Sequence, residues 1–544
     1  SLIVLASTGC ISTEEHVARA DERAYGILNR ASQAVTGEAK TFDILRPVDT
    51  LRERLKISKT PVVLDLKSAL DVAAENSRDY QRQKETLYRA ALSLSGEQHE
   101  FETHFGSSGS ADISGSDDSS AQVRFREALS ASVNTESGGR LVASFATTFL
   151  RSIINGDSLD GTSILGLTFT QPLLRGFGPR IVRENLTQSE RNVVYAMRDF
   201  ERSRSTLALR IVQDYYRVLS LMDNLKNTRI NHQSLVRDRI RMVMLVLSNR
   251  QRAEDLDQAK QRELVAENSV LSTAARLENS LDQFKITLGL PADSQLALDP
   301  REYERLQGVT LESAQLVEDR LVAFALGKRM DYRSSRDREA DAARSILVAE
   351  DALRSILNFS AALDVPTEGS NKPFNIDWDK VSWSAGFDLD LALDRYDQAN
   401  AYRRALISYA QAQRSTEQLQ DEIKRDIRDT IRTLKTLEKS YAIDQAAVTL
   451  AERRVKRTEA FMLAGGRNRT ETRDVLEAKD DLLAAQLSLT GSLVDFAVAK
   501  LQLLRDLESL PLEPKGLRYD PGLEIPKEAL HPPTRSEEPR EDKK

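Results

Sequence analysis

The sequence contains an uninterrupted stretch, from Arg180 to Leu288, without a glycine or a proline. Ordinary globular helices run about 8–20 residues, so this much longer stretch indicates helices of another kind. In its first half, apolar residues recur at the steps of three, four or seven that are typical of a coiled-coil seam. They are Val193, Met197, Phe200, Leu207, Ile211, Tyr215, Val218, Met222 and Leu225. We predict two long helices that fold back on each other near Ser248–Asp255, each with about 60 residues and on the order of 90 Å long.

Two regions show the alternation of apolar and polar residues that is typical of β-strands. The first, at about 101–174, is rich in Gly, Ser, Thr and Asp, and the second lies at about 357–393. The last strand of the second region places six apolar residues, from Trp383 to Leu393, on one face and Asp388 and Asp390 on the other. A barrel with lipid outside and water inside requires this pattern. We expect the two carboxylates to face a lumen; alternatively, they only solvate the periplasmic rim.

The two halves of the chain repeat each other. Residues Ala73–Tyr80 align with Ala325–Tyr332, and Asp255–Lys260 align with Asp474–Lys479. The offset is 332 − 80 = 252 residues for the first pair of segments and 474 − 255 = 219 for the second. The first half is therefore longer by 252 − 219 = 33 residues between these segments, and we assign the surplus to an extra hairpin near 106–137. Each unit comprises a helix (64 to about 101, and 311 to about 356), a strand pair and a long helical hairpin. A repeated unit that cannot bury its own apolar face stacks around a common axis.

This pattern predicts a mainly α chain with a β membrane part, in two structural repeats. The first repeat is predicted at 65–300, with strands at about 101–174 and a helical hairpin at 180–288. The second is predicted at 301–510, with strands at about 357–393 and a hairpin at 396–510. Residues 511–544 hold seven prolines and many charges, so we expect a disordered tail there.

The N-terminal region indicates export. Cys10 is the only cysteine, and it follows an apolar stretch with small residues that resembles the end of a bacterial lipoprotein signal, a lipobox, at 1–10. Cys10 is therefore a candidate for lipidation; alternatively, it is an incidental residue of a leader. Residues 11–64 are expected to form a polar N-terminal periplasmic segment with a helix around Glu14–Gln33.

Composition and motifs argue against several functions. The net charge of −6 does not indicate a nucleic-acid-binding surface. The sequence contains no stretch of 18 or more apolar residues, so it predicts no transmembrane helix. The five histidines lack metal-ligand spacing. Residues Arg175–Gly178 have a G-x-G core but lack the third glycine of a dinucleotide site. We expect no enzyme activity, no cofactor and no metal.

The order of elements and several local sequences resemble the TolC-like outer-membrane efflux proteins over about residues 64–510. The most specific matches are Leu167–Gly176, where a strand passes into a helix, and Asp474–Ala478. Pro172, Gly176 and Pro179 mark that passage. The resemblance implies a homotrimer in which each protomer gives four strands to a shared twelve-strand barrel and helices to a periplasmic α-helical tunnel. The extra β residues depart from the four-strand pattern.

The resemblance also implies a gate. Asp474 and Glu477 would constrict the tunnel at the second hairpin tip, three residues apart and on one helix face. A basic residue four positions before the first acid would bond to an aspartate of the other hairpin, matched by Asp255, but Thr470 stands there. The nearest substitutes are Arg467, Arg469 and Arg473. Alternatively, these charges form only a solvated helix turn.

The hypothesis is a channel in the bacterial outer membrane with a long periplasmic portion, part of a tripartite efflux or type I secretion system. It would conduct substrates passively and bind a periplasmic adaptor and an inner-membrane transporter, with the turns at 244–249 and 462–466 meeting the adaptor. For Gly465–Gly466 the alternative is a simple helix break. Two rival functions are a lipid-anchored coiled-coil envelope spacer and a periplasmic adaptor without a pore. Adaptors usually have one helical hairpin, whereas this chain has two.

Overall fold

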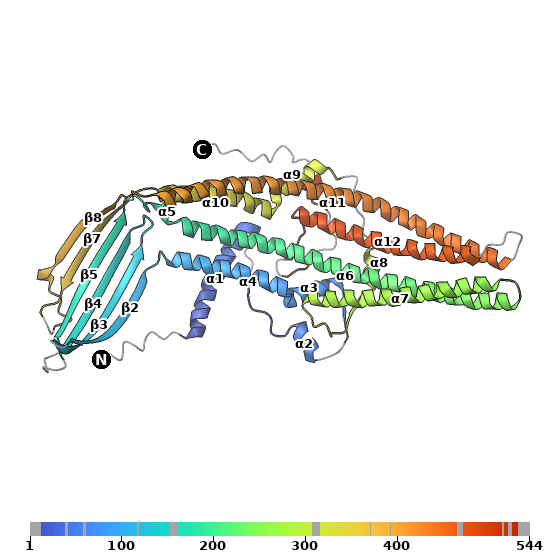
Figure 1. Ribbon diagram of the computed structural model, residues 1–544, viewed down its shortest axis with the longest axis horizontal. Coiled ribbons are helices and arrows are strands. Elements are labelled where there is room, and N and C mark those ends of the chain that lie inside the picture. The colour runs from blue at the N-terminus through green and yellow to red at the C-terminus, as the bar shows by residue number, and fades with distance from the viewer. Residues whose placement is uncertain are drawn as a thin grey trace. The chain divides into compact units, whose positions relative to one another are not determined.

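The computed structural model describes residues 12–38, 42–57, 61–116, 119–152, 160–306, 316–369, 372–391, 393–464, 472–513, 516–519 and 525–530 (Figure 1). Cys10, Arg467, Arg469, Thr470 and Gly465–Gly466 therefore lie outside the described residues. The chain divides into two compact units. The sheet unit comprises Ser1–Phe42, Thr86–Met197 and Ser334–Glu417, and the hairpin unit comprises Asp43–Glu85, Arg198–Arg333 and Gln418–Lys544.

Two long helical hairpins are present. The first joins α6 (Glu184–Leu247, 64 residues) to α7 (Ala253–Leu288, 36 residues), and the second joins α11 (Tyr396–Ala464, 69 residues) to α12 (Thr472–Asp506, 35 residues). The fold-back near residue 248 is confirmed. The prediction of two arms of equal length is wrong, because a turn at that position leaves α7 only about 54 Å long.

The shorter arm of the first hairpin meets another helix end to end. α7 ends at Gly289, which has a left-handed φ of 79°. A Cβ at Gly289 would collide with the carbonyl of Asn76, the last residue of α3 (Leu66–Asn76). The guanidinium of Arg52, in α2 (Leu51–Ile57), donates to the Gly289 carbonyl. A separate helix, α3, thus meets the end of the shorter arm, α7.

The repeated framework is visible in the bounds of four helices. α3 (Leu66–Asn76) and α4 (Arg78–His99) correspond to α9 (Glu318–Lys328) and α10 (Met330–Asp351), and every bound is shifted by the same offset, since 318 − 66 and 351 − 99 are both 252. Ser77 and Arg329 interrupt the helices with extended ψ angles of 126° and 123°. Their N–H groups donate to the carbonyls of Ala73 and Ala325. The single helices predicted at 64–101 and 311–356 are therefore two helices each.

One antiparallel sheet of six strands forms the core of the sheet unit, with the order β2-β3-β4-β5-β7-β8 (Figure 1). The strands are β2 (His104–Ser116), β3 (Ser119–Asn134), β4 (Arg140–Ser152), β5 (Asp160–Pro172), β7 (Ile356–Pro366) and β8 (Ser382–Asp390). The extra strand pair predicted in the first half is confirmed, so the four-strand count implied by the resemblance is wrong. The sheet is open.

The strand register places most apolar side chains on the same face of the six strands, where Glu127, Thr147 and Ser163 are polar exceptions. Leu129 lies opposite Phe145, Leu167 opposite Leu363, and Phe359 opposite Phe387. On this face Trp383 is 79% exposed and Phe387 is 70% exposed. Asp388 and Asp390, opposite Asn358 and Ile356, point to the other face because successive strand residues alternate. The predicted alternation of β8 is confirmed; a lumen role for its acids stays a prediction.

Shorter elements complete both units. The sheet unit also holds α1 (Thr13–Thr36), which confirms the helix predicted around Glu14–Gln33, α5 (Pro179–Val182) and the 3-10 turn η3 (Trp378–Lys380). In the hairpin unit β1 (Val62–Leu64) pairs in parallel with β6 (Leu296–Leu298), followed by α8 (Arg301–Leu306). Its core buries Tyr215, Phe284, Leu288 and Leu321.

Part of the tail predicted to be disordered is ordered, and it includes α13 (Lys527–Leu530). The buried Arg204 guanidinium of α6 donates to the carbonyls of Glu513 and Gly516, and Leu517 and Tyr519 are buried. Prolines and charges predict disorder only where no partner stabilises the backbone. Here an arginine far earlier in the chain supplies that partner.

Among the described helices, α12 is long and apolar enough to cross a membrane, judged by length and composition alone. It was not predicted because Gly491 and Asp495 interrupt its apolar run. In the structure its Leu493, Phe496 and Ala497 are buried in the hairpin unit. Part of its apolar surface is therefore used for helix packing.

We expect Gly289→Ala to lower the free energy of unfolding by about 1–3 kcal/mol, because alanine is strained at positive φ and its Cβ meets the Asn76 carbonyl. Urea unfolding followed by far-UV circular dichroism measures this. Gly327→Ala in α9 is the control: a Cβ there has no described atom within 4 Å, so stability should stay level or rise by up to about 1 kcal/mol. Equal effects of the two substitutions would contradict the end-to-end contact.

Candidate functional site

The first hairpin tip is a tight turn between α6 and α7. Asn249 has a left-handed φ of 56°, and the N–H groups of Asn249 and Arg250 donate to the carbonyls of Val246 and Leu245. Such bonds satisfy the last carbonyls of a helix. The Asp255 carboxylate accepts from the Arg252 N–H at 3.2 Å and so caps the start of α7. Asp255, predicted as a gate partner, is thus engaged locally.

Apolar side chains project from this turn into solvent. Met244 is 63% exposed and Leu247 is 78% exposed. Exposed apolar side chains at the end of a solvated hairpin are typical of a surface that meets another protein. They lie within the predicted adaptor-binding turn at 244–249.

The acids of the second hairpin lie in the first turns of α12. Glu477 faces Arg454 of α11 at 3.5 Å, and Asp481 also binds Arg454. All three side chains are about half exposed, so this cluster is held by screened charges. Asp474 lies one turn earlier, next to Arg473, and negative charge is favourable there because it complements the helix N-terminus.

A buried lysine joins the two hairpins behind these acids. The Lys479 ammonium lies 2.5 Å from Asp238 of α6 and 2.8 Å from Glu459 of α11, and it donates to Ser234 at 2.8 Å. Lys479 is 5% exposed and Asp238 is 7% exposed. A small apolar cluster is formed nearby by Leu235 of α6, Ala266 of α7 and Leu476 of α12. The ammonium therefore bridges two carboxylates from two helices.

A second ion pair crosses between the hairpins near the surface. Arg262 of α7 donates to Asp480 of α12 at 2.7 Å. Burial raises the pKa of the Asp480 carboxyl, and the neighbouring charges of Asp481 and Glu477 raise it further, while Arg262 acts to lower it. Burial has the largest effect on this pKa. Acid therefore acts on the Arg262–Asp480 ion pair by protonating Asp480.

Sequence reasoning placed Asp474 and Glu477 on one side of α12 but missed Lys479, Asp238 and Arg454. The available signal was the position of Lys479 in an apolar seam, one turn after the buried Val475 and Leu476. Its aligned counterpart Lys260 is exposed and pairs with Asp257 at 3.3 Å. The repeat alignment therefore hides the difference, because identical residues occupy opposite environments.

The passage from β5 into α6 uses the residues that the sequence singled out. Gly176 has φ 77° and Gly178 has φ 98°, and Pro179 begins α5. The Gly176 N–H donates to the Asp351 carboxylate at 2.7 Å. Glycine and proline suit this corner because the chain must turn at positive φ and then enter a helix.

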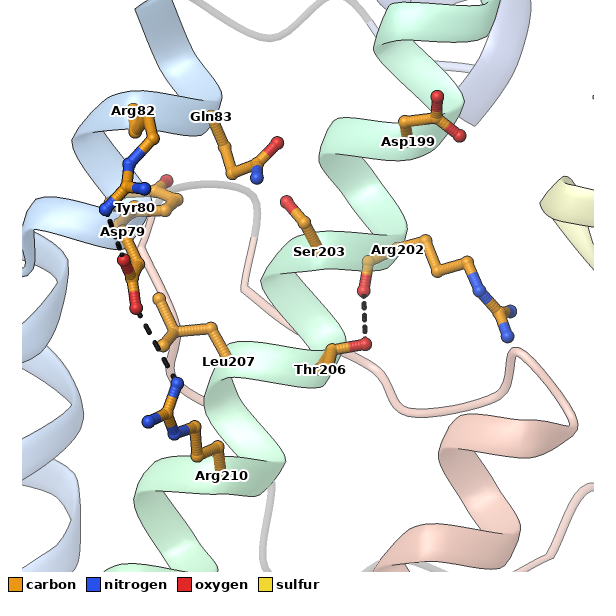
Figure 2. Close-up of a pocket in the computed structure, with 10 residues that line it drawn as sticks. All are labelled: Asp79, Tyr80, Arg82, Gln83, Asp199, Arg202, Ser203, Thr206, Leu207 and Arg210. Atoms are coloured by element: carbon orange, nitrogen blue, oxygen red, sulfur yellow. Dashed lines mark hydrogen bonds and ion pairs between the residues drawn. The ribbon is translucent and has the colours of Figure 1, made fainter. Parts of the chain in front are cut away.

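A polar groove of about 430 Å³ lies between α4 and α6 in the hairpin unit (Figure 2). Asp79 lies between Arg82 at 2.9 Å and Arg210 at 3.7 Å, while the Arg202 side chain points away from it (Figure 2). The Tyr80 ring stacks on Phe200, and burial raises the pKa of its phenol. The carboxylate is already paired with two cations, an arrangement that suits helix packing.

The described residues hold no group of three or more His, Cys, Asp or Glu side chains that could bind a metal ion. His99 and His104 stack edge to face with ring centroids 4.5 Å apart, and His99 is hydrogen-bonded to Glu102.

No model of a known protein family matches the sequence, and no curated protein matches it. Among solved structures, the chain is similar to the outer-membrane channel OprN, with 15% identity and a TM-score of 0.60 over 86% of this chain and 94% of that one. The Campylobacter jejuni CmeC outer-membrane channel gives 15% identity and 0.60 over 84% and 87%. The Neisseria gonorrhoeae MtrE outer-membrane channel, in its open state, gives 12% and 0.58 over 81% and 88%.

The chain has the fold of the outer-membrane channels. This fold is the one that the resemblance to the TolC-like proteins implied. Within it, the ion pairs of Lys479, Arg454 and Arg262 lie at the tips of the two helical hairpins of one chain.

We expect Lys479→Met to lower the free energy of unfolding of this channel-fold chain by up to about 3–5 kcal/mol, because the buried Asp238 loses its ammonium partner and keeps only Arg241, at 3.4 Å. Lys479→Met combined with Asp238→Asn should recover part of the loss. Lys260→Met is a matched control with an exposed lysine, expected within about 0.5 kcal/mol of the parent. Urea midpoints measure all four proteins, and a silent Lys479→Met would contradict the buried bridge.

The raised pKa of Asp480 gives a pH dependence with a definite sign. Its contribution to stability is fully present below the ordinary carboxyl pKa of 3.8 and is lost as the pH rises through the raised folded value. Compared with Asp480→Asn, the parent should therefore become relatively less stable as the pH rises through that window. Melting temperatures over a pH series measure this. A parent that gains stability over the asparagine variant in the same window would show that the Arg262 pair dominates.

Proposed function

We propose that this chain is the subunit of an outer-membrane channel that conducts substrates passively across the periplasm and the outer membrane. The observation that carries the proposal is the exposed, largely apolar face of the six-stranded sheet, with charged and small polar residues on its other face. A monomeric soluble protein rarely exposes such a surface, whereas a barrel in lipid requires it. The fold shared with solved outer-membrane channels supports the same function.

The proposed assembly is a homotrimer of a tripartite efflux or type I secretion system, with a periplasmic adaptor and an inner-membrane transporter as partners. An open sheet cannot stay in lipid with unpaired edges, so several copies must close it together. Helices such as α6, on the order of 96 Å long at about 1.5 Å per residue, suit a conduit through the periplasm. Met244 and Leu247 provide apolar contacts for an adaptor.

The chain would perform no chemistry and need no cofactor. Selectivity would come from charge at the hairpin tips, where Asp474 and Glu477 of each copy repeat around the channel axis. Arg454 already compensates part of this charge, and Arg467, Arg469 and Arg473 are further candidates for pairing. Cys10 would add a lipid anchor, and Asp388 and Asp390 would line the barrel.

The rival function of a coiled-coil envelope spacer would use the long helices but leaves the apolar sheet face without a role. Current through a planar bilayer separates the two functions. Purified protein should insert and conduct steadily if it is a channel. A folded, oligomeric preparation that gives no current at any pH would contradict the proposed function and favour the spacer.

We expect Asp474→Asn with Glu477→Gln to reduce the cation preference of the channel, because rings of carboxylates attract cations. The reversal potential in a salt gradient measures this preference. Glu15→Gln, which removes an exposed carboxylate in α1, is the control and should leave the reversal potential unchanged. An unchanged reversal potential in the double variant would contradict the acidic ring.

A further inference from the structure

The two edges of the sheet are strands β2 and β8. Among the described strands, β2 pairs only with β3, and β8 pairs only with β7. Every step across the sheet is antiparallel, and six is an even number, so the two edges run in opposite directions. An edge β8 and an edge β2 from another copy could therefore continue the same antiparallel pattern.

Both edges lack the lysines, prolines and central bulges that keep many edge strands from pairing. Edge strands of soluble proteins carry Lys, Pro or central bulges. Neither β2 nor β8 contains Lys, Arg or Pro, and the one irregularity of β2 lies at its end, between Ser114 and Ser116. The register β2 makes with β3 is otherwise regular from His104 to Ser114. These edges are suited to accept a further strand.

The repeat shows where the extra strands entered the chain. β2 begins at His104 and β7 at Ile356, and this offset (356 − 104 = 252) equals that of the preceding helices. β5 ends at Pro172 and β8 at Asp390, and this offset (390 − 172 = 218) equals that between the ends of α7 and α12, 506 − 288. The surplus of the first repeat therefore lies between the end of α4 and the end of β5, as one additional strand pair among β2 to β5.

This placement constrains how the sheet can close. A loosely attached strand pair could fold away and leave four strands to form the barrel. Here, folding β2 and β3 away would break the β3–β4 ladder, which is continuous from Gln122 to Asn134. Folding β3 and β4 away would break the β2–β3 and β4–β5 ladders.

The side chains at the two edges are complementary in size. On the apolar face, β2 carries Ser107, Gly109 and Ala111 between Phe105 and Ile113, and these three small residues border a groove of about 640 Å³ beside Phe125, Glu127 and Phe149. On the same face, β8 carries Trp383 and Phe387, 79% and 70% exposed. Large rings beside small residues pack well across neighbouring strands.

We propose that β2 of one copy pairs with β8 of the next, so that each chain contributes six strands to a shared barrel. Three copies would then close eighteen strands, in place of the twelve expected from the four-strand pattern. Barrel diameter grows roughly linearly with strand number, and barrels of about 16–18 strands leave an aqueous channel. The inference rests on the proposed channel function, because only a barrel in lipid needs this closure.

Disulfide cross-linking in the full-length chain tests the interface. Ser384→Cys on β8 is combined in turn with Ser108→Cys, Ser110→Cys and Asp112→Cys on β2, all on the polar face of the sheet. Matched controls combine Ser384→Cys with Ser144→Cys, Ala146→Cys or Thr148→Cys on β4, on the same face. Single-cysteine variants measure any background cross-linking that involves Cys10. Only neighbouring strands bring two such cysteines within bonding range.

The proposal expects non-reducing gels with bands of two and three chain masses for at least one β2 variant and for no β4 variant. Links to β4 alone, or links within a single chain, would overturn it. Planar-bilayer current on the same preparations distinguishes failure of this inference from failure of the proposed function. Protein that conducts but forms no β2–β8 links overturns the inference alone. A parent protein that gives no current overturns the proposed function. As a second measurement, cryo-electron microscopy of the assembly in a nanodisc counts the strands: eighteen support the inference, and fewer overturn it.

Discussion

The need of every backbone N–H and C=O for a partner governs how this chain can exist in a membrane. Inside lipid no water replaces a missing partner, so an open antiparallel sheet is stable only when its edges are joined. The six strands satisfy each other internally but expose one edge at β2 and one at β8. The apolar face that would meet lipid and the edges that need strands belong to the same sheet. In the proposed channel, oligomerisation and membrane insertion would therefore be two consequences of one constraint.

The hairpin tips follow a different principle, since they are held by charge. A buried ammonium between two carboxylates is a poor source of stability compared with apolar packing, but breaking it leaves a charge without a partner. Lys479 thus defines the arrangement of α6, α11 and α12 more than it strengthens it. The exposed pairs of Arg454 and Arg262 around it are screened and can exchange partners at little cost. The hairpin tips therefore combine one fixed, buried ion pair with exposed ion pairs that can rearrange.

Much of the fold was predictable because it rests on periodicity. The glycine- and proline-free run predicted the first hairpin, alternation predicted the strands, and the unequal offsets predicted the extra strand pair. The breaks at Ser77 and Arg329 were not predictable, since neither residue is a helix breaker and each is extended only where the end of one helix meets other elements. The ordered tail was missed for a similar reason: its anchor is the buried Arg204, far away in the sequence.

The site was less predictable than the fold because its residues gain their roles from environment. Asp255 and Asp474 align, as do Lys260 and Lys479, yet Asp255 caps its own helix and Lys260 remains in solvent. Duplication gives a chain two equivalent hairpin tips, but the two tips present different sides where they pack against each other. Of the aligned lysines, Lys479 lies between the hairpins and Lys260 does not. The first half holds an additional strand pair and the second half holds the buried Lys479 bridge, so the two halves differ both in the sheet and at the hairpin tips.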